Sequence, residues 1–415
     1  MLLIMVGVAM LWWLMPEKNR SPIRVGVLHS LTGTMAISEK PVVDATLLAI
    51  AQINQAGGLL GRKIEAIVVD GKSDAAVFGR EAERLIVQEH VAAIFGCWTS
   101  ASRKNVKQVV EKYHHLLFYP LQYEGFEASP NIIYMGAVPN QQIIPAVHWA
   151  LTHLGKRIYL IGSDYVFPRV ANWLIRKQVQ LQGGTIVGER YLLLGTQDVD
   201  ATVREIAALK PDVILNTING DSNLAFFHAL AQAGMTAQDW PVMSFSMGEA
   251  EVASMKNKLP MQGYYAAWSY FQSIDSVENR TFIAAFKQKY GDERVLSDPM
   301  EAAWVGVQLW ADAVRNANTD SAAVVSQTIQ HRSMHAPEGT VSIDHATHHL
   351  WKKSLVGKLL ADGQFEIVWS SEKPIAPEPY PSFVSKLAAK QYMTTLQQGW
   401  SGRWEAVRPA KVNQP

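Results

Sequence analysis

Hydroxyl, amide and aromatic side chains gather in loops that follow predicted strands, and they suit binding better than bond-breaking chemistry. One such loop is GCWTSAS, in which the hydroxyls of Thr99, Ser100 and Ser102 stand where a helix is predicted to begin. Free backbone N–H groups at a helix start, together with such hydroxyls, favour a carbonyl or carboxylate oxygen. The same hydroxyls also suit an ordinary helix cap that binds no ligand.

Five further loops carry side chains of the same kinds. They hold hydroxyls, amides, aromatic rings and a few carboxylates, which suit a small neutral or zwitterionic ligand held by hydrogen bonds. In chain order these loops are His29–Thr34, Tyr119–Gly125, Gly162–Pro168, Asn219–Asn223 and Ser244–Glu249.

Signatures of common enzymes are absent from the sequence. It contains no G-x-S-x-G, no G-x-x-x-x-G-K-[ST] and no H-E-x-x-H, and no G-x-G-x-x-G follows the first strand. Cys97 has no His base at a recognisable spacing, which favours packing at a strand end over a nucleophile. His345, His348 and His349 lack an acidic partner, which favours solvated or structural histidines over a metal site. We therefore expect a protein that is not an enzyme and needs no cofactor and no metal.

Strands and helices alternate along the chain, first over residues 23–119 and again over residues 157–245. Apolar strands such as IRVGVLH, IEAIVVD and RIYLIG are separated by amphipathic helices, which is typical of a parallel sheet covered on both faces. We expect an α/β fold of two doubly wound lobes joined by several crossover strands. Ligands bind outside the carboxyl ends of such strands, so the loops above should line a cleft between the lobes.

The patterns divide the chain into four parts. Residues 1–22 are a signal or anchor segment, 23–138 with 266–338 form lobe 1, 139–265 with 339–373 form lobe 2, and 374–415 form a Pro-rich C-terminal extension beyond the folded core. As a helix, the apolar run 1–15 spans about 22 Å, which is short for a hydrocarbon core of about 30 Å but suits a signal peptide. No Lys or Arg precedes the run and no A-x-A-like site follows it, so an uncleaved anchor is the alternative. We expect an exported or periplasmic protein.

Composition excludes several classes of protein. The 415 residues carry 38 Lys and Arg against 37 Asp and Glu, a formal charge of +1, and this balance argues against nucleic-acid binding. One cysteine excludes an internal disulfide and a multi-cysteine metal site within one chain. The length suggests two or three domains.

Several loops resemble those of one known family. GCWTSASRK, FYPLQYEGFEASPNIIYMGAVPNQQIIPAV, YLIGSDYVFPR and VMSFSMGEAEV are similar to segments of the urea-binding proteins of ABC transporters and, less closely, of the amide-binding regulator of aliphatic amidase. The resemblance covers roughly Ile23 to Ser382 and implies the type I periplasmic-binding fold of the branched-chain amino acid receptors. It also implies a receptor that closes on a small neutral ligand and hands it to an ABC permease in the membrane.

The resemblance implies a set of ligand-binding residues. Gln122 matches the YP-x-Q-Y pattern of the urea proteins, and Glu249 lies where the amino-acid receptors bind an amino group. Urea has one carbonyl acceptor and four N–H donors, so its site needs donors for the oxygen and acceptors for both nitrogens. Trp98 and Tyr165 would sandwich the flat molecule. The expected ligand-binding residues are Trp98, Thr99, Ser100, Tyr119, Gln122, Asp164, Tyr165, Ser246, Met247 and Glu249.

The sequence is also compatible with two other functions. A regulatory sensor that binds urea or an amide and restrains a partner regulator would share the fold, and neighbouring permease genes would distinguish a transport role. An enzyme that uses Cys97 is the less favoured alternative because no base accompanies the thiol.

Overall fold

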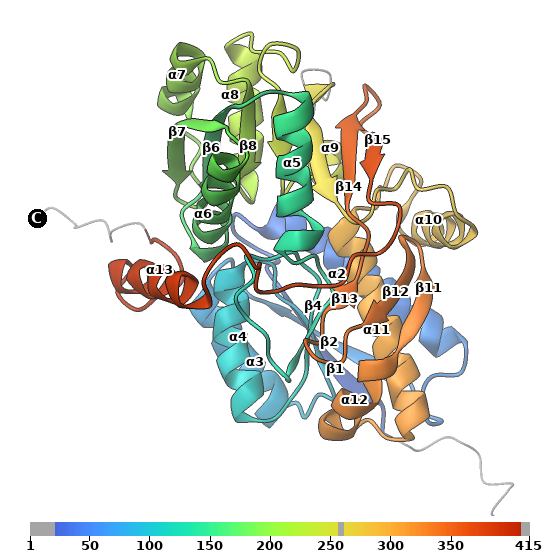
Figure 1. Ribbon diagram of the computed structural model, residues 1–415. Helices are drawn as coiled ribbons and strands as arrows, with labels where there is room; N and C mark the ends of the chain where they lie inside the picture. The colour runs from blue at the N-terminus through green and yellow to red at the C-terminus, as the bar shows by residue number, and fades with distance from the viewer. Residues whose placement is uncertain (1–20, 256–260, 408–415) are drawn as a thin grey trace, which may run out of the picture.

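The computed structural model describes residues 21–255 and 261–407, which form two α/β lobes (Figure 1). Parallel strands flanked by helices make up both lobes, so the predicted α/β class is confirmed. Of the expected signal or anchor segment, residues 1–20 lie outside the described residues. Within 21–255 and 261–407, no helix combines the length and the apolar character needed to cross a bilayer.

The first lobe contains a parallel five-stranded sheet in the order β2-β1-β3-β4-β5. Its strands are β1 (Ile23–His29), β2 (Ile64–Asp70), β3 (Ile94–Gly96), β4 (Leu117–Tyr119) and β5 (Ile132–Tyr134). Its helices are α2 (Ala36–Gln55), α3 (Ala75–Val87), α4 (Ser100–Lys112), α10 (Val277–Tyr290), α11 (Asp298–Ala317) and α12 (Ala322–Thr328). The carboxyl ends of β3 and β4 therefore lie at the same edge of the sheet.

The second lobe contains a seven-stranded sheet in the order β15-β14-β10-β9-β8-β6-β7. Its strands are β6 (Arg157–Ser163), β7 (Thr185–Leu192), β8 (Val213–Thr217), β9 (Val242–Ser244), β10 (Tyr265–Trp268), β14 (Leu355–Leu359) and β15 (Phe365–Ser370). Strands β6 to β10 pair in parallel, whereas β14 and β15 form an antiparallel hairpin. Its helices are α5 (Ile143–His153), α6 (Val166–Leu181), α7 (Asp200–Leu209), α8 (Asp221–Gln232) and α9 (Glu249–Ser254).

Two strands belong to other sheets than the expected lobe boundaries imply. Strand β10 pairs with β9 and β14, so the expected boundary at residue 266 falls inside a strand of the second sheet. Strand β12 (Gly339–Ile343) pairs with β11 (Ser333–Ala336) and β13 (Leu350–Trp351) in a small third sheet. Buried side chains of this sheet, including Val341 and Leu350, join the core of the first lobe. Local hydrophobicity predicts that a strand exists but not which sheet it joins.

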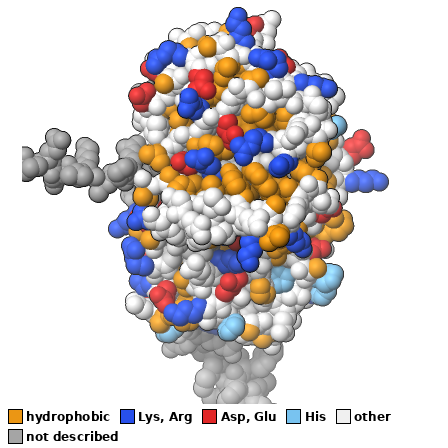
Figure 2. Space-filling view, turned by 60° about the vertical axis from the view of Figure 1, so that its left-hand side comes forward, with side chains coloured by type: hydrophobic (Ala, Val, Ile, Leu, Met, Phe, Trp, Pro, Cys, Tyr) orange, Lys and Arg blue, Asp and Glu red, His pale blue; other side chains and the backbone are white. Residues whose placement is uncertain are grey.

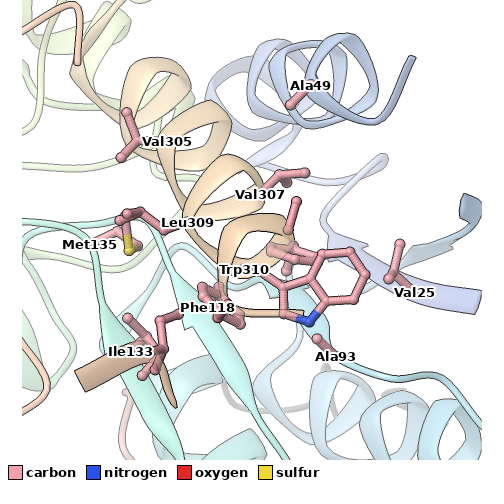
Figure 3. Close-up of a cluster of buried hydrophobic side chains, with 14 of the residues drawn as sticks. Val25, Ala49, Ala93, Phe118, Ile133, Met135, Val305, Val307, Leu309 and Trp310 are labelled. Carbon is pink, nitrogen blue, oxygen red and sulfur yellow. The ribbon is translucent and has the colours of Figure 1, made fainter. Parts of the chain in front are cut away.

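The core of the first lobe is built where α11 crosses the sheet (Figure 3). Trp310 of α11 is fully buried and meets Phe95 of β3 edge to face, with ring centroids 5.7 Å apart. Phe95 in turn stacks on Phe118 of β4 at 4.9 Å. Since burying a large apolar side chain contributes about 1.5–3 kcal/mol, this packing fixes the strands whose ends carry the candidate site.

The C-terminal extension is packed against the second lobe instead of lying beyond the folded core. Helix α13 (Lys386–Gly399) contacts α6, and Figure 1 shows it beside α6 and α4. Ala389 is fully buried, and Tyr392 stacks on Trp173 of α6 with centroids 5.4 Å apart. The Pro-rich stretch after Pro374 is therefore a connection to a packed helix, and its composition did not indicate that this helix packs against the second lobe.

Candidate functional site

The loops after the strands of both lobes meet, as the fold predicts. Trp98, after β3, donates a hydrogen bond from its indole Nε1 to Asn219 Oδ1, after β8, at 3.0 Å. Gln122, after β4, donates from Nε2 to the carbonyl oxygen of Phe245, after β9, at 2.7 Å. These contacts between loops of opposite lobes mean that the structure is a closed conformation.

The loop after β3 ends in a helix cap. Thr99 is the N-cap of α4, and its Oγ1 accepts a hydrogen bond from the Ser102 backbone N–H at 3.0 Å. The hydroxyl groups of Thr99 and Ser102 also contact each other at 3.1 Å. The N–H groups of Ser100 and Ala101 lie in the first turn, where a helix offers no internal acceptor. The Thr99 hydroxyl therefore serves as a cap, whereas the two backbone donors are of the kind that bind a ligand oxygen.

Ser100 belongs to a buried charged network. Its hydroxyl donates to Glu124 Oε2 at 2.5 Å and accepts from Arg103 Nη1 at 2.9 Å. Arg103 also contacts Glu124 Oε1 at 3.1 Å and Glu127 Oε1 at 2.9 Å. Burial by itself would raise the pKa of Glu127, but Lys104 and Arg103 outweigh it and hold this pKa well below its usual range. The Ser100 side chain is thus engaged in the network and orients the start of α4.

Two glutamines share one acceptor between the lobes. Gln122 and Gln142 both direct Nε2 at the Phe245 carbonyl oxygen, at 2.7 and 3.3 Å. Among the described residues, neither side-chain oxygen Oε1 has a hydrogen-bond partner, although both are buried. Tyr119 lies beside them and donates from its hydroxyl to the Trp98 carbonyl oxygen at 2.7 Å. The two amide oxygens are therefore buried acceptors without a donor from the described chain.

Tyr165 and its neighbour Asp164 differ in their surroundings. Tyr165 precedes α6 and is only 1% exposed, and its pKa is raised well above the usual value by burial and by the nearby Tyr119 and Glu124. The Tyr165 ring of the second lobe thus lies close to Tyr119 and Glu124 of the first lobe. In contrast, Asp164 Oδ1 accepts a hydrogen bond from Arg169 Nε at 2.7 Å, so this carboxylate is already paired.

Ser246 and Met247 make contacts within the second lobe. Ser246 Oγ donates to the Ile218 carbonyl oxygen at 2.5 Å. The Met247 side chain joins the apolar core, and its carbonyl oxygen accepts from Trp268 Nε1 at 2.8 Å. Both residues support the loop after β9.

Glu249, the first residue of α9, is a buried acid with one unused oxygen. Its Oε1 accepts from the Gln272 backbone N–H at 2.8 Å, whereas Oε2 has no partner among the described residues. Burial raises the pKa of Glu249 to about 8, and the nearby Asp298 and Glu251 add to the rise. At neutral pH the side chain is therefore mainly a neutral acid, with an O–H donor as well as an acceptor.

Neither Cys97 nor the histidine cluster has the surroundings of a reactive centre. Cys97 is fully buried, and burial together with Glu39 raises the pKa of its thiol, which keeps it protonated. His349 stacks on Tyr134 with centroids 4.0 Å apart, and burial lowers its pKa to about 3. Within 21–255 and 261–407, no group of three or more His, Cys, Asp or Glu side chains is arranged to hold a metal ion.

Several residues of this site were not among those predicted. Asn219 and Glu124 stand in polar loops that follow predicted strands, but nothing local in the sequence indicates their partners Trp98 and Ser100. Arg103 lies inside α4 and Gln142 directly precedes α5, and neither position has a sequence signal of its own. All four make contacts with segments distant in the chain, which only the folded structure brings together.

Comparison with known proteins places this geometry in a family. The model of the periplasmic binding protein domain matches residues 23–386, so the chain belongs to that family. A solute binding protein of an ABC transporter from Rhodopseudomonas palustris HaA2, in complex with p-hydroxybenzoic acid, is similar in fold, with a TM-score of 0.78 at 21% identity over 87% of this chain and 99% of that one. A leucine binding protein from Thermotoga maritima is similar with a TM-score of 0.73 at 17% identity over 84% and 98%.

Two curated relatives differ in how much they share. Leu/Ile/Val-binding protein homolog 6 of Brucella melitensis is 21% identical over 342 residues, which are 79% of this chain and 85% of that protein. A limonene hydroxylase of Geobacillus stearothermophilus is 35% identical over 117 residues, but the match spans 28% of this chain and only 21% of that protein. The type I periplasmic-binding fold predicted from the sequence is thus confirmed, and so is membership of the periplasmic binding protein family. These comparisons do not extend to the predicted resemblance to urea-binding proteins.

Proposed function

We propose that the protein is the substrate-binding component of an ABC uptake system and binds urea or a short-chain amide between its lobes. The observation that carries the choice of ligand is the Gln122 amide, whose oxygen is buried without a donor among the described residues. A small ligand with N–H donors would satisfy this acceptor. The family favours export to the periplasm and delivery to a membrane permease, as the proposed role requires.

The rest of the site supports an uncharged ligand. The carboxylates near the cleft are paired or protonated: Glu124 contacts Arg103 and Ser100, Asp164 contacts Arg169, and Glu249 is mainly a neutral acid. A charged ligand would therefore meet no free counter-charge among these groups. The amides at the start of α4 would bind the ligand carbonyl, and Gln122 would accept from its nitrogen.

Aromatic rings would supply the walls of this site. Trp98 is 4% exposed and is held by Asn219, whereas Tyr165 is 1% exposed on the opposite lobe. Flat rings on both sides suit a planar amide and exclude water, which strengthens each hydrogen bond inside.

Calorimetry on the purified protein tests the proposal directly. Urea, acetamide and formamide are titrated alongside leucine and p-hydroxybenzoate. Heat with urea or a short amide, and none with the other two compounds, supports the proposal. Binding of only leucine or p-hydroxybenzoate overturns the choice of ligand, and silence with all five overturns it as well.

A variant connects the binding to the proposed acceptor. Gln122→Leu removes the amide, and an unpaired ligand N–H costs about 1–3 kcal/mol, so we expect the Kd to rise roughly 5- to 150-fold. Gln180→Leu, on the exposed face of α6, is the matched control and should leave the Kd unchanged. An unchanged Kd in Gln122→Leu would remove Gln122 from the site.

A further inference from the structure

A short segment of the C-terminal extension pairs with the second lobe at the candidate site. The Val166 backbone N–H donates to the Trp404 carbonyl oxygen, and the Ala406 N–H donates to the Asp164 carbonyl oxygen, both at 2.9 Å. Between these bonds Tyr165 lies opposite Glu405 in an antiparallel bridge. The extension therefore adds a strand-like edge beside a residue predicted to contact ligand.

The same segment also contacts the first lobe. The Lys104 Nζ of α4 lies 4.8 Å from the ring centre of Trp404, within range of a cation–π interaction. The Glu405 carboxylate receives the backbone N–H of Ala75, the first residue of α3. One tripeptide thus touches both lobes.

The antiparallel bridge determines where the Glu405 side chain lies. Directly opposed residues of an antiparallel pair place their side chains on one face, with Cβ atoms about 4.5–5.5 Å apart. The Glu405 side chain therefore stands next to the Tyr165 ring and reaches across to α3. This position puts it at the border between the lobes, on the side where Tyr165 enters the site.

Helix α13 secures the segment to the second lobe. Its residues Ala389 and Tyr392 pack on α6, and further aromatic side chains of the extension are partly buried against the same core. Figure 2, in which the α13 side of Figure 1 comes forward, shows apolar side chains gathered across the middle of this face. The family match ends at residue 386, so α13 from its second residue onward and the segment after it lie outside the matched domain.

We propose that Trp404–Ala406 is a latch that forms an outer wall of the ligand site beside Tyr165 and holds the two lobes closed. The segment is anchored on the second lobe, so opening of the cleft breaks its contacts with Lys104 and Ala75. Contacts present only in the closed state shift the population toward that state and slow ligand release. The identity of the ligand depends on the proposed function, whereas the closure of the lobes by the latch does not.

Two shortened proteins test the latch. One ends at Arg403 and loses Trp404–Ala406 but keeps α13, and the other ends at Val407 and keeps the latch as the matched control. Small-angle scattering without ligand measures the radius of gyration. Stopped-flow tryptophan fluorescence measures the dissociation rate of urea or acetamide.

We expect the protein that ends at Arg403 to have the larger radius of gyration and to release ligand about tenfold faster, which corresponds to the loss of two modest contacts. Equal radii together with equal release rates in the two proteins would overturn the latch. If neither protein binds urea or an amide, the proposed ligand fails, and the scattering comparison alone decides whether the latch exists.

A point variant guards against an indirect effect of shortening the chain. Glu405→Ala removes the carboxylate that receives the Ala75 N–H, whereas Glu378→Ala removes an exposed carboxylate of the same extension. We expect a larger radius of gyration in Glu405→Ala and no change in Glu378→Ala. A radius unchanged in both variants would show that Glu405 does not hold the lobes together.

Discussion

Trp98 and Asn219 join the two lobes through one buried hydrogen bond, in which the indole Nε1 donates to Oδ1 at 3.0 Å across 121 positions of the chain. Trp98 is 4% exposed and Asn219 is 1% exposed, so water does not readily replace either partner. The bond therefore exists only while the lobes are closed. It links the geometry of the site directly to the conformational state of the protein.

Removal of the Asn219 side chain should favour the open state. In Asn219→Ala the indole N–H of Trp98 stays buried without its acceptor when the lobes close, at a cost of about 1–3 kcal/mol. The ratio of closed to open molecules should fall roughly 5- to 150-fold, and the ligand affinity should also fall. Scattering and calorimetry measure the two effects. Asn316→Ala, on the exposed end of α11, is the control, and identical behaviour of both variants would contradict this role.

Arg103 should be essential to the stability of the first lobe. It lies fully buried between Glu124 and Glu127, and its removal leaves buried carboxylates without that partner. Arg103→Met should lower the free energy of unfolding by about 3–5 kcal/mol, as measured by guanidinium chloride denaturation. Arg204→Met replaces an exposed arginine of α7 and should change it little. If Arg103→Met lowered the free energy of unfolding no more than Arg204→Met does, water would be solvating Glu124 and Glu127 in place of the lost guanidinium.

Much of the fold follows from local hydrophobic pattern. The expected strand IRVGVLH coincides with β1, and the expected strand RIYLIG matches β6 to within one residue. Both strands are strongly apolar on their own. The membership of β10 and β12 was not predictable in this way, because the partner of a strand depends on segments far away in the chain.

The candidate site shows the same division. Trp98, Gln122 and Tyr165 lie at the meeting point of the lobes, where loops after parallel strands are expected. The pairing of Asp164 with Arg169 and of Ser100 with Glu124 was not predicted, since residue type does not reveal which partner a polar group finds. The Trp404–Ala406 segment was missed because a Pro-rich stretch precedes it.

His349 should make the protein less stable in mild acid. Burial lowers its pKa to about 3, against 6.5 for a free histidine. Between these values the unfolded chain binds a proton that the folded protein does not, so stability falls as the pH drops below about 6.5. His349→Gln removes the titrating ring, and the decrease in Tm from about pH 7 to pH 4.5 should become smaller. The exposed His335→Gln should keep the parent's full decrease, and equal decreases in the two variants would contradict the assignment.

Glu249 should make the protein less stable as the pH rises, whereas His349 does so as the pH falls. Its pKa of about 8 lies above the ordinary value of 4.5, so the folded protein keeps a proton that the unfolded chain loses as the pH rises from 4.5 to 8. The stability that this proton provides is complete below about pH 4.5 and is lost as the pH passes 8. Glu249→Gln imitates the protonated acid and should not show this loss.

The comparison of parent and variant at two pH values isolates this group from the other buried acids. At about pH 5 the two proteins should unfold at similar guanidinium chloride concentrations, whereas at about pH 9 the variant should be more stable by roughly 3–5 kcal/mol. Glu366→Gln, on the exposed side of β15, should follow the parent at both values. Urea is unsuitable as the denaturant because it is the proposed ligand. Equal stability of parent and Glu249→Gln at pH 9 would mean that the pKa of Glu249 is not raised in the folded protein. The group would then be a carboxylate at neutral pH, and the site would carry a negative charge.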